Sequence, residues 1–272
     1  MSFVKQFNAI VTDPKVRESA QLFLDEGNRH ELFINYFGVN YNDSDLVSVK
    51  LYFSFLQPPS EDLFSFMDLE EHQRTLVNQN WKPSDEYQYM HQGLTFGLKC
   101  YLNNSEVSIN PYLHFRCKEL ALGDPEQLLL NNQDKENYPG ICYEKHHNSV
   151  EQKKYFYITS QENKINLLDD FNLTNEIDLS ALTAIEYTET PRENKVNLSM
   201  SSSDAVYDYL KGLSNSKIME LCQYFYEHYG LYVFCPGVRK NSSTKAIYFV
   251  PKEAYYALIP MQTLKQILTH TL

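Results

Sequence analysis

Three stretches of the sequence place a basic residue two positions from an aromatic one, so that both fall on one face of a predicted strand. They are Lys50 with Tyr52, Lys99 with Tyr101, and the run Tyr112, His114 and Arg116. Basic side chains bind anions, and aromatic faces attract positive charge. Strand side chains alternate between faces, so each stretch can present both types while its other face stays apolar. The pattern predicts either a solvated sheet face or the wall of a barrel lined with cations and aromatics.

The predicted strands that carry these residues cover 47–55, 94–102 and 107–117. In the first strand, Val47, Val49 and Leu51 fall on one face and Ser48 and Lys50 on the other. The second strand repeats this alternation. Cys100 falls on its apolar face and is therefore expected to be a small core residue.

Composition limits the classes of protein that fit. The chain has 272 residues, of which 43% are hydrophobic, and it contains 21 Tyr and 16 Phe against one Trp. Tyrosine combines an apolar ring with a polar tip and suits partly wet interiors and interfaces. The net charge of −11 argues against a general nucleic-acid binder. Without a long apolar run or a signal-peptide core, the protein is expected to be cytoplasmic and not membrane-bound. Five cysteines without CxxC spacing indicate neither a disulfide framework nor a zinc site.

The order of predicted elements suggests hairpins separated by helices. Asp13 is the expected N-cap of a helix over 14–25, and Gly230 is expected to end a helical region that begins near residue 203. Further helices are predicted over 60–79 and from 253 to the C-terminus, with a helical or loop stretch reaching to about 150. The remaining predicted strands are Tyr155–Thr159 with Lys164–Leu168, Leu182–Thr188 with Lys195–Met200, and Leu231–Cys235 with Lys245–Val250.

This succession predicts an α+β fold in one domain over residues 1–272. About ten antiparallel strands could close into a barrel that leaves no sheet edge, with a ring of helices outside and the polar strand faces around a solvent-filled lumen. Such a barrel has room for a ligand.

The αββα order and several segments resemble the ABBA aromatic prenyltransferases, whose fold is called the PT barrel. The segments are Val49–Pro59, Phe96–Tyr112, Asn194–Met200 and Ala246–Pro251, and the first two are most similar to the peptide-modifying branch of cyanobactin pathways. The resemblance implies an enzyme that transfers a dimethylallyl or geranyl group from its diphosphate through a transition state like an allylic cation. It implies as acceptor a peptide, or a small aromatic metabolite, and we expect a monomer.

The resemblance also implies roles for individual residues. Those expected to bind diphosphate are Lys50, Lys99, Arg116, His114, Lys195 and Asn197. Those expected to shield the carbocation are Tyr52, Tyr101, Tyr112, Tyr187 and Tyr248. For His114 and Lys195, a place in the barrel wall or on a surface hairpin stays open. Lys245 has the opposite parity to Tyr248, so one of the two is expected to point away from the lumen.

The resemblance implies a carboxylate near the acceptor as well. Glu186, which lies mid-strand, is the first candidate for a base, with Glu31 and Asp45 as alternatives. No Asp-Asp-x-x-Asp motif occurs, so no metal ligand is assigned, and Mg2+ enters only as an optional counter-ion of the diphosphate.

Two other classes of function compete with the enzyme. A non-catalytic adaptor that binds a peptide or protein would carry its lysines and tyrosines on the outer surface instead of the interior. A hydrolase or metalloenzyme could use Glu144 with His146 and His147, but adjacent histidines on a polar loop are more often solvated than metal-bound. No phosphate-binding glycine loop, nucleophile elbow or zinc-protease motif is present.

Overall fold

The computed structural model describes residues 1–21, 32–55, 93–102, 107–114, 140–146, 149–190, 193–213 and 215–251, with isolated helical positions between 61 and 75. The strands are β1 (Leu32–Tyr41), β2 (Leu46–Phe55), β3 (Gly93–Tyr101), β4 (Val107–His114), β5 (Gly140–His146), β6 (Ser149–Ile158), β7 (Leu182–Glu189), β8 (Lys195–Met200), β9 (Leu231–Arg239) and β10 (Lys245–Pro251). The helices are α1 (Phe3–Thr12), α6 (Gln161–Asp170), α7 (Ser203–Gly212) and α8 (Ser216–Tyr229), with a short 3-10 turn at Leu179–Ala181.

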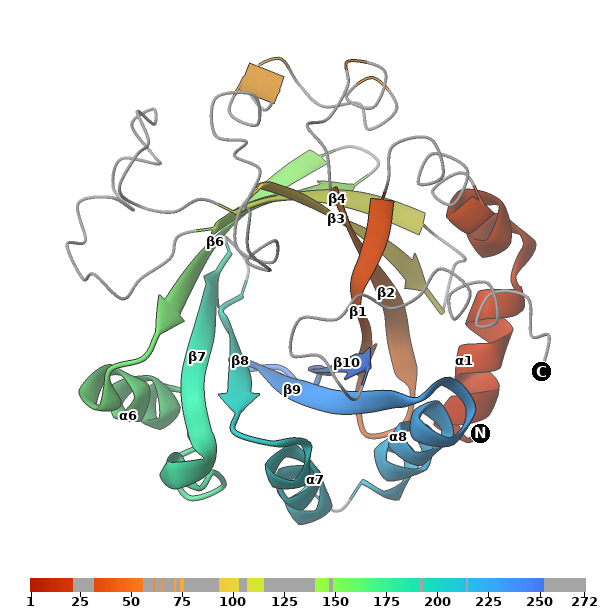
Figure 1. Ribbon diagram of the computed structural model, residues 1–272. Coiled ribbons are helices and arrows are strands. Elements are labelled where there is room, and N and C mark those ends of the chain that lie inside the picture. Colours follow the sequence, from red (N-terminus) through yellow and green to blue (C-terminus); the bar gives the residue numbers. More distant parts are fainter. Residues whose placement is uncertain are drawn as a thin grey trace.

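The ten strands pair antiparallel in the order β1-β10-β9-β8-β7-β6-β5-β4-β3-β2. The first strand pairs with β10 on one side and with β2 on the other, so the ring of strands closes (Figure 1). The α+β class and the antiparallel order predicted from the sequence are confirmed. In such a ring, residues directly opposite one another on neighbouring strands share a face, so the register assigns side chains to the inside or the outside.

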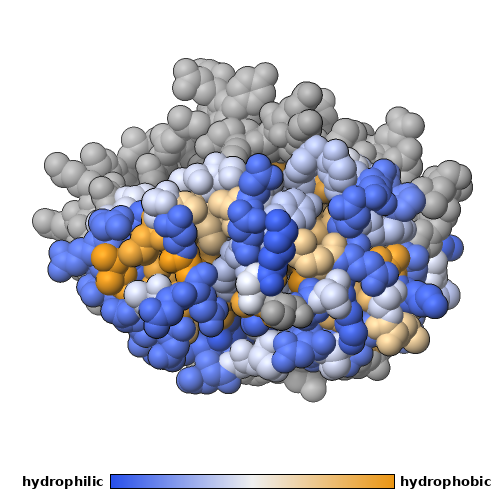
Figure 2. All heavy atoms as spheres, turned by 90° about the horizontal axis from the view of Figure 1, so that it is seen from below, coloured by the Kyte–Doolittle hydropathy of each residue, from blue (hydrophilic) through white to orange (hydrophobic). Residues whose placement is uncertain are grey.

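The outer face of the ring is apolar because the helices pack on it. Figure 1 shows α1, α6, α7 and α8 outside the strands. Phe225 of α8 contacts Phe7 of α1 and Phe249 of β10, with ring centroids 4.8 and 4.7 Å apart. Val49 and Leu98 belong to the same buried core. From below, this side of the molecule is mostly hydrophilic, with smaller apolar areas (Figure 2). Lys50 and Lys99 alternate with Val49 and Leu98 along their strands, so they lie on the opposite face, which points into the ring.

Helix boundaries follow the capping residues. Asn215 accepts hydrogen bonds from the backbone amides of Lys217 and Ile218 and so begins α8. Gly230 ends α8 with a φ of 62°, in the left-handed region that favours glycine. The helical region predicted up to Gly230 is thus confirmed, although it consists of two helices. Among the helices that the structure describes, none combines the length and apolar character needed to cross a bilayer.

The left-handed conformation of Gly230 carries a stability prediction. Gly230→Ala should lower the free energy of unfolding by about 1 to 2 kcal/mol, because a Cβ is strained at this φ. Urea unfolding measures the change. Gly212→Ala is the matched control, since a Cβ there would have no neighbour within 4 Å. An equal loss in both variants would contradict the assignment of strain to Gly230.

The predicted hairpin over Tyr155–Thr159 and Lys164–Leu168 is wrong. Its first part belongs to β6, but the second part lies in the helix α6. The hydroxyl of Ser160 accepts a hydrogen bond from the amide of Asn163 and caps this helix. Lys164 and Leu168, four residues apart, are buried together on one helix face, and Lys164 Nζ donates to the carbonyl of Leu182. The apolar positions of this segment thus follow the helical period of 3.6 residues and not the strand period of two.

Other elements were missed or shifted. The helix α1 and the strand β1 had no counterpart in the sequence prediction, and β5 replaces part of a stretch expected to be helix or loop. Glu144 and His146 therefore lie in a strand instead of a polar loop. Asp13 does begin a helical stretch, since its carboxylate accepts from the amide of Lys15. The predicted helices over 60–79 and from 253 onward lie outside the continuous ranges that the structure describes.

Candidate functional site

The inner strand face gathers basic and aromatic residues that lie far apart in the sequence. Lys50, Tyr52, Lys99, Lys195, Asn197 and Tyr248 are all buried there, each at most 9% exposed. They come from β2, β3, β8 and β10. Four of the strands on the ring thus bring the residues predicted for one site onto the same face.

Two pairs of like charges oppose one another directly across strand pairs. Lys50 on β2 is the partner of Lys99 on β3. Lys195 on β8 is the partner of Arg239 on β9. Like charges at directly opposed positions destabilise a sheet, and burial increases the cost. We call these four residues the inner cations. Their placement costs stability, which is typical of a site built for an anion.

Tyr248 lies between the two pairs. Its ring centroid is 4.9 Å from Lys195 Nζ and 6.0 Å from Lys50 Nζ. Gly38 on β1, the register partner of both Lys50 and Tyr248, makes this possible. A Cβ on Gly38 would lie 2.8 Å from Tyr248 Cδ1. The ring therefore occupies the space that a side chain at position 38 would fill.

Tyr52 and Tyr101 complete the described aromatic part of the site. The rings of Tyr52 and Tyr248 lie 6.1 Å apart. Lys99 Nζ lies 4.5 Å from the centroid of Tyr101, on the same strand. Each of the inner lysines is thus close to a tyrosine face, where cation–π attraction operates.

Two polar side chains of β8 form hydrogen bonds to β7 and β10. Lys195 Nζ donates to the hydroxyl oxygen of Tyr248 at 2.6 Å, and Asn197 Nδ2 donates to Glu186 Oε1 at 2.6 Å. Gly237 faces Asn197 across the β8–β9 pair. A Cβ on Gly237 would lie 2.5 Å from Asn197 Oδ1 and 2.7 Å from Lys195 Cε. The absence of a side chain at position 237 thus fixes where both polar groups lie.

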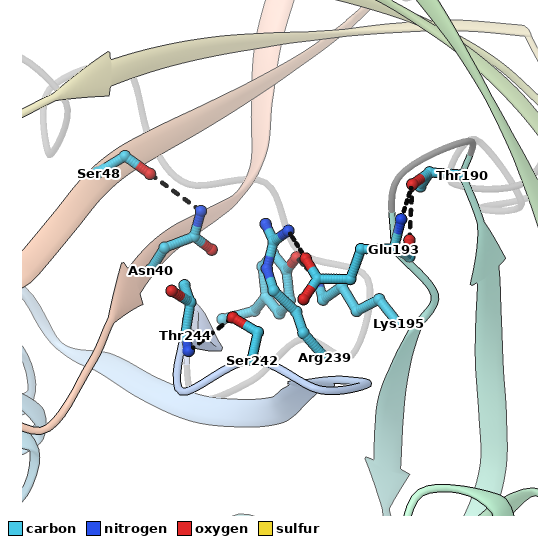
Figure 3. A network of polar contacts seen from close by, with 9 residues as sticks. Asn40, Ser48, Thr190, Glu193, Lys195, Arg239, Ser242 and Thr244 are labelled. Carbon is cyan, nitrogen blue, oxygen red and sulfur yellow. Dashed lines mark hydrogen bonds and ion pairs between the residues drawn. The ribbon is translucent and has the colours of Figure 1, made fainter.

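Arg239 meets a carboxylate from the loop between β7 and β8. Its Nη1 lies 2.7 Å from Glu193 Oε2. Figure 3 shows the two side chains pointing toward each other beside Lys195, with Asn40 and Ser48 nearby. Thr190 holds the loop, because its hydroxyl donates to the carbonyl of Glu193 and accepts from the amide of Glu193. One inner cation is therefore paired within the protein.

Burial and mutual repulsion shift the protonation equilibria of these groups. Burial, and then the charges of Lys195, Lys99, Arg239 and Lys153, hold the pKa of Lys50 well below its ordinary value. Burial and the Arg239 charge lower the pKa of Lys195 to about 7, although Glu186 opposes the shift. Burial also raises the pKa of Glu186, against the effects of Asn197 and Lys195. A bound anion would offset the repulsion between the inner cations and favour their charged forms.

Five buried side chains on the inner face have a polar atom without a hydrogen-bond partner in the described structure. They are Asn40 Oδ1, Ser108 Oγ, Asn110 Oδ1, Thr188 Oγ1 and Asn197 Oδ1. Buried polar groups are nearly always hydrogen-bonded in native proteins. The inner face therefore offers several hydrogen-bonding atoms that the described protein groups leave unused.

The close approach at Gly237 gives a testable result. Gly237→Ala should displace Lys195 and Asn197 and weaken binding of inorganic diphosphate about tenfold or more, because a charged contact is lost. Calorimetric titration measures the affinity. Gly212→Ala, with no neighbour within 4 Å, should bind as the parent does. Unchanged affinity in a folded Gly237→Ala protein would show that Lys195 and Asn197 do not contact the anion.

Some of the predicted site residues cannot be placed on the inner face. Tyr112 and His114 lie in β4, opposite Thr95 and Gly93, but their side chains lie outside the described part of the structure. Arg116 and Glu31 lie outside it altogether. Asp45 is exposed at the turn between β1 and β2, where its carboxylate accepts from Gln6 Nε2 at 2.8 Å. It is therefore not a carboxylate of the interior.

The expectation that Tyr187 faces the interior is wrong. Its ring lies 6.0 Å from Phe156 and 6.5 Å from Phe171, and it packs against the outer core. Tyr187 is the register partner of Val196, which is part of that core. Its neighbour Glu186 has the opposite parity and faces inward. The opposite parity of Lys245 and Tyr248 is also seen, with Tyr248 as the inward residue.

Sequence reasoning missed Arg239, Glu193 and Gly237. The predicted strand stopped at Cys235 because Pro236-Gly237 is typical of a turn. In the structure β9 continues to Arg239, so that Cys235, Gly237 and Arg239 alternate on the inner face. The spacing of two from Cys235 to Arg239 is the signal that could have revealed them. Within the described ranges, no group of three His, Cys, Asp or Glu side chains could hold a metal ion.

Comparison with known proteins identifies similar solved structures but no family. No protein-family model matches the sequence, and no curated protein matches it. Among solved structures, the crystal structure of NotF prenyltransferase is similar, with a TM-score of 0.48 and 10% sequence identity over 82% of this chain and 81% of that one. A likeness this distant assigns neither the family nor the activity of the chain.

Proposed function

We propose that the chain is a prenyltransferase whose inner cations bind the diphosphate of a dimethylallyl or geranyl donor. One observation carries this proposal: three buried lysines and the half-buried Arg239 form two directly opposed pairs of cations on the inner face, beside the rings of Tyr52, Tyr101 and Tyr248. Cations stabilise a diphosphate as it leaves, and aromatic faces stabilise the allylic cation that it leaves behind. The same inner face offers both.

The residues of the site have three roles: binding diphosphate, shielding the allylic cation and accepting a proton. Diphosphate is bound by Lys50, Lys99 and Lys195, with Asn197 as a neutral donor and with Arg239 if it exchanges Glu193 for the ligand. The allylic carbons are surrounded by Tyr52, Tyr101 and Tyr248. We keep the roles expected from the sequence for His114, Tyr112 and Arg116 as part of this proposal.

In the transfer step, the allylic C–O bond breaks and its electron pair leaves with diphosphate. An electron pair of the acceptor forms the new carbon bond, and Glu186 accepts the proton that the acceptor loses.

Glu186 suits the role of base because of its surroundings. Its pKa is raised by burial, so the carboxylate is a stronger base than an exposed one. Asn197 Nδ2 holds one of its oxygens at 2.6 Å and leaves the other to meet an acceptor. The acceptor is a peptide side chain or a small aromatic metabolite, and we propose a monomeric single domain over residues 1–272.

The adaptor alternative predicts aromatic residues on the outer surface. Among the described residues, the large hydrophobic side chains that are exposed are Met1 and Tyr226. The lysines and tyrosines expected at a binding surface are instead buried inside. This distribution favours an internal ligand over an external partner.

The test is a transfer assay with purified protein. Dimethylallyl and geranyl diphosphate are each incubated with peptides that carry Trp, Tyr, Arg or His and with small aromatic acceptors, and mass spectrometry detects the gain of one prenyl unit. We expect a product with at least one combination. If no combination gives a product and calorimetry detects no diphosphate binding, the proposal fails.

Removal of divalent metal provides an independent prediction. Because the inner cations supply positive charge to the diphosphate, transfer should persist in excess EDTA, with Mg2+ acting only as an additional counter-ion. The initial rate of product formation with and without EDTA measures this. Complete loss of activity in EDTA, restored by Mg2+, would mean that a metal and not the inner cations neutralises the leaving group.

A further inference from the structure

We propose that Lys195 is a nucleophilic amine that forms an imine with an aldehyde carrying a phosphate group. This reaction needs no prenyl donor, so the proposal does not rest on the transferase activity. It arises from the contact between the amine of Lys195 and the hydroxyl of Tyr248.

Lys195 is buried with 9% exposure, yet its amine contacts a phenol hydroxyl rather than a carboxylate. Its Nζ lies 2.6 Å from the hydroxyl oxygen of Tyr248, while the nearby carboxylates have other partners: Glu186 is hydrogen-bonded to Asn197, and Glu193 is paired with Arg239. The titratable and charged groups that face Lys195 come from five other strands. They are Glu186 of β7, Arg239 and Cys235 of β9, Tyr248 of β10, Lys50 of β2 and Lys153 of β6.

This environment favours the neutral amine, which is the nucleophilic form. Arg239 lies directly opposite and keeps its own charge at all ordinary pH values. Burial and this neighbour lower the pKa of Lys195 to about 7. An exposed lysine such as Lys211, whose side chain is 64% exposed, lies in water beside Asp208 instead.

Tyr248 can supply the proton that imine formation requires. Burial and nearby Glu186 raise the pKa of its phenol, so the hydroxyl stays protonated and acts as a relay, taking up one proton as it gives up another. The lone pair of the Lys195 amine attacks the carbonyl carbon while the carbonyl π electron pair moves to oxygen, and one proton passes from nitrogen to that oxygen through the Tyr248 hydroxyl, which gives a carbinolamine. The carbinolamine C–O bond then breaks, and the departing hydroxide takes a proton from Tyr248 and leaves as water. The nitrogen electron pair forms the C=N bond, and the proton that nitrogen loses returns to Tyr248.

The other inner cations determine which aldehydes fit. Lys50 and Lys99 lie opposite one another on the same inner face and keep their positive charges near the site once Lys195 has reacted, while Arg239 is paired with Glu193. Thr188, the register partner of Lys195, lies beside it, and its buried hydroxyl has no hydrogen-bond partner among the described residues. A phosphate recognised by cations and hydroxyl donors is typical of anion sites in proteins. The chemical class is therefore a small phosphorylated aldehyde.

Labelling with pyridoxal 5'-phosphate followed by borohydride reduction tests the proposal on the unaltered protein. Reduction converts the imine to a stable secondary amine, and peptide mapping locates it. We expect Lys195 to be labelled first, about tenfold or more faster than Lys211, and pyridoxal without phosphate to react about tenfold or more slowly. The rate should rise as the pH passes about 7. Inorganic diphosphate should slow labelling if both anions share the inner cations.

Three results would overturn the proposal. These are labelling of Lys50 or Lys99 ahead of Lys195, equal rates at Lys195 and Lys211, and equal labelling by pyridoxal and its phosphate. Lys195→Arg, which keeps the charge without the nucleophile, should lose the adduct, and Tyr248→Phe should slow its formation. Because mapping on the parent protein decides the site, a variant that fails to fold does not leave the question open.

Discussion

Replacing Lys50 by Met weakens binding of inorganic diphosphate about 10- to 100-fold and at the same time stabilises the protein. The first effect follows because a contact between a charged donor and phosphate is lost. The second follows because Lys50 is 8% exposed and lies directly opposite Lys99 without a carboxylate as its register partner. An apolar side chain of similar length removes both repulsion and desolvation. Calorimetric titration and urea unfolding measure the two quantities.

Because binding is expected to weaken while stability rises, a loss of binding in this variant cannot be attributed to unfolding. Lys211→Met is the matched control, since Lys211 is 64% exposed on α7, and it should change neither quantity appreciably. The stability of the parent protein should also rise with pH in the range between the lowered pKa of Lys50 and its ordinary value, because the unfolded chain binds more protons there. Lys50→Met should flatten this rise. A variant that loses both binding and stability would contradict a functional reason for the buried charge.

Diphosphate affinity should fall as the pH rises above about 7. Lys195 has a pKa of about 7 without ligand. A bound anion favours its charged form and raises that pKa, so the complex holds more protons than the ligand-free protein. The affinity therefore decreases with rising pH, by about tenfold per pH unit for each proton taken up. Calorimetry in two buffers of different ionisation enthalpy measures the proton uptake directly.

Lys195→Arg is the control for this pH dependence. Arginine stays charged over the whole range, so the variant should bind diphosphate without the proton uptake that belongs to position 195. Changes in the protonation of diphosphate itself affect both proteins equally and cancel in the comparison. If parent and variant show the same pH dependence, Lys195 does not change its protonation on binding.

The sequence predicts the inner face well where strands alternate strictly. Lys50, Lys99 and Tyr248 lie inside because their neighbours Val49, Leu98 and Phe249 fit the apolar outer core. A period of two is a local property, so it can be read without knowing the pairing of the strands. The same alternation correctly places Lys245 and Tyr248 on opposite faces of β10.

The sequence fails where contacts between distant segments decide the outcome. Tyr187 is aromatic and precedes a predicted turn, but the pairing of β7 with β8 places it beside Val196 on the outer core. Arg239 follows Pro236-Gly237, which reads as a turn locally, while pairing with β8 keeps it in a strand. The ion pair between Arg239 and Glu193 joins residues 46 positions apart. No local pattern contains such a contact.

Calorimetric titration with the slowly reacting donor analogue dimethylallyl S-thiolodiphosphate tests the central claim most directly. If the inner cations form the donor site, the parent protein binds one equivalent, Lys211→Met binds as the parent does, and the double variant Lys50→Met, Lys99→Met shows no saturable binding. An absence of binding by the parent, or equal affinity in the parent and a folded double variant, would contradict the assignment of this inner face as a prenyl diphosphate site.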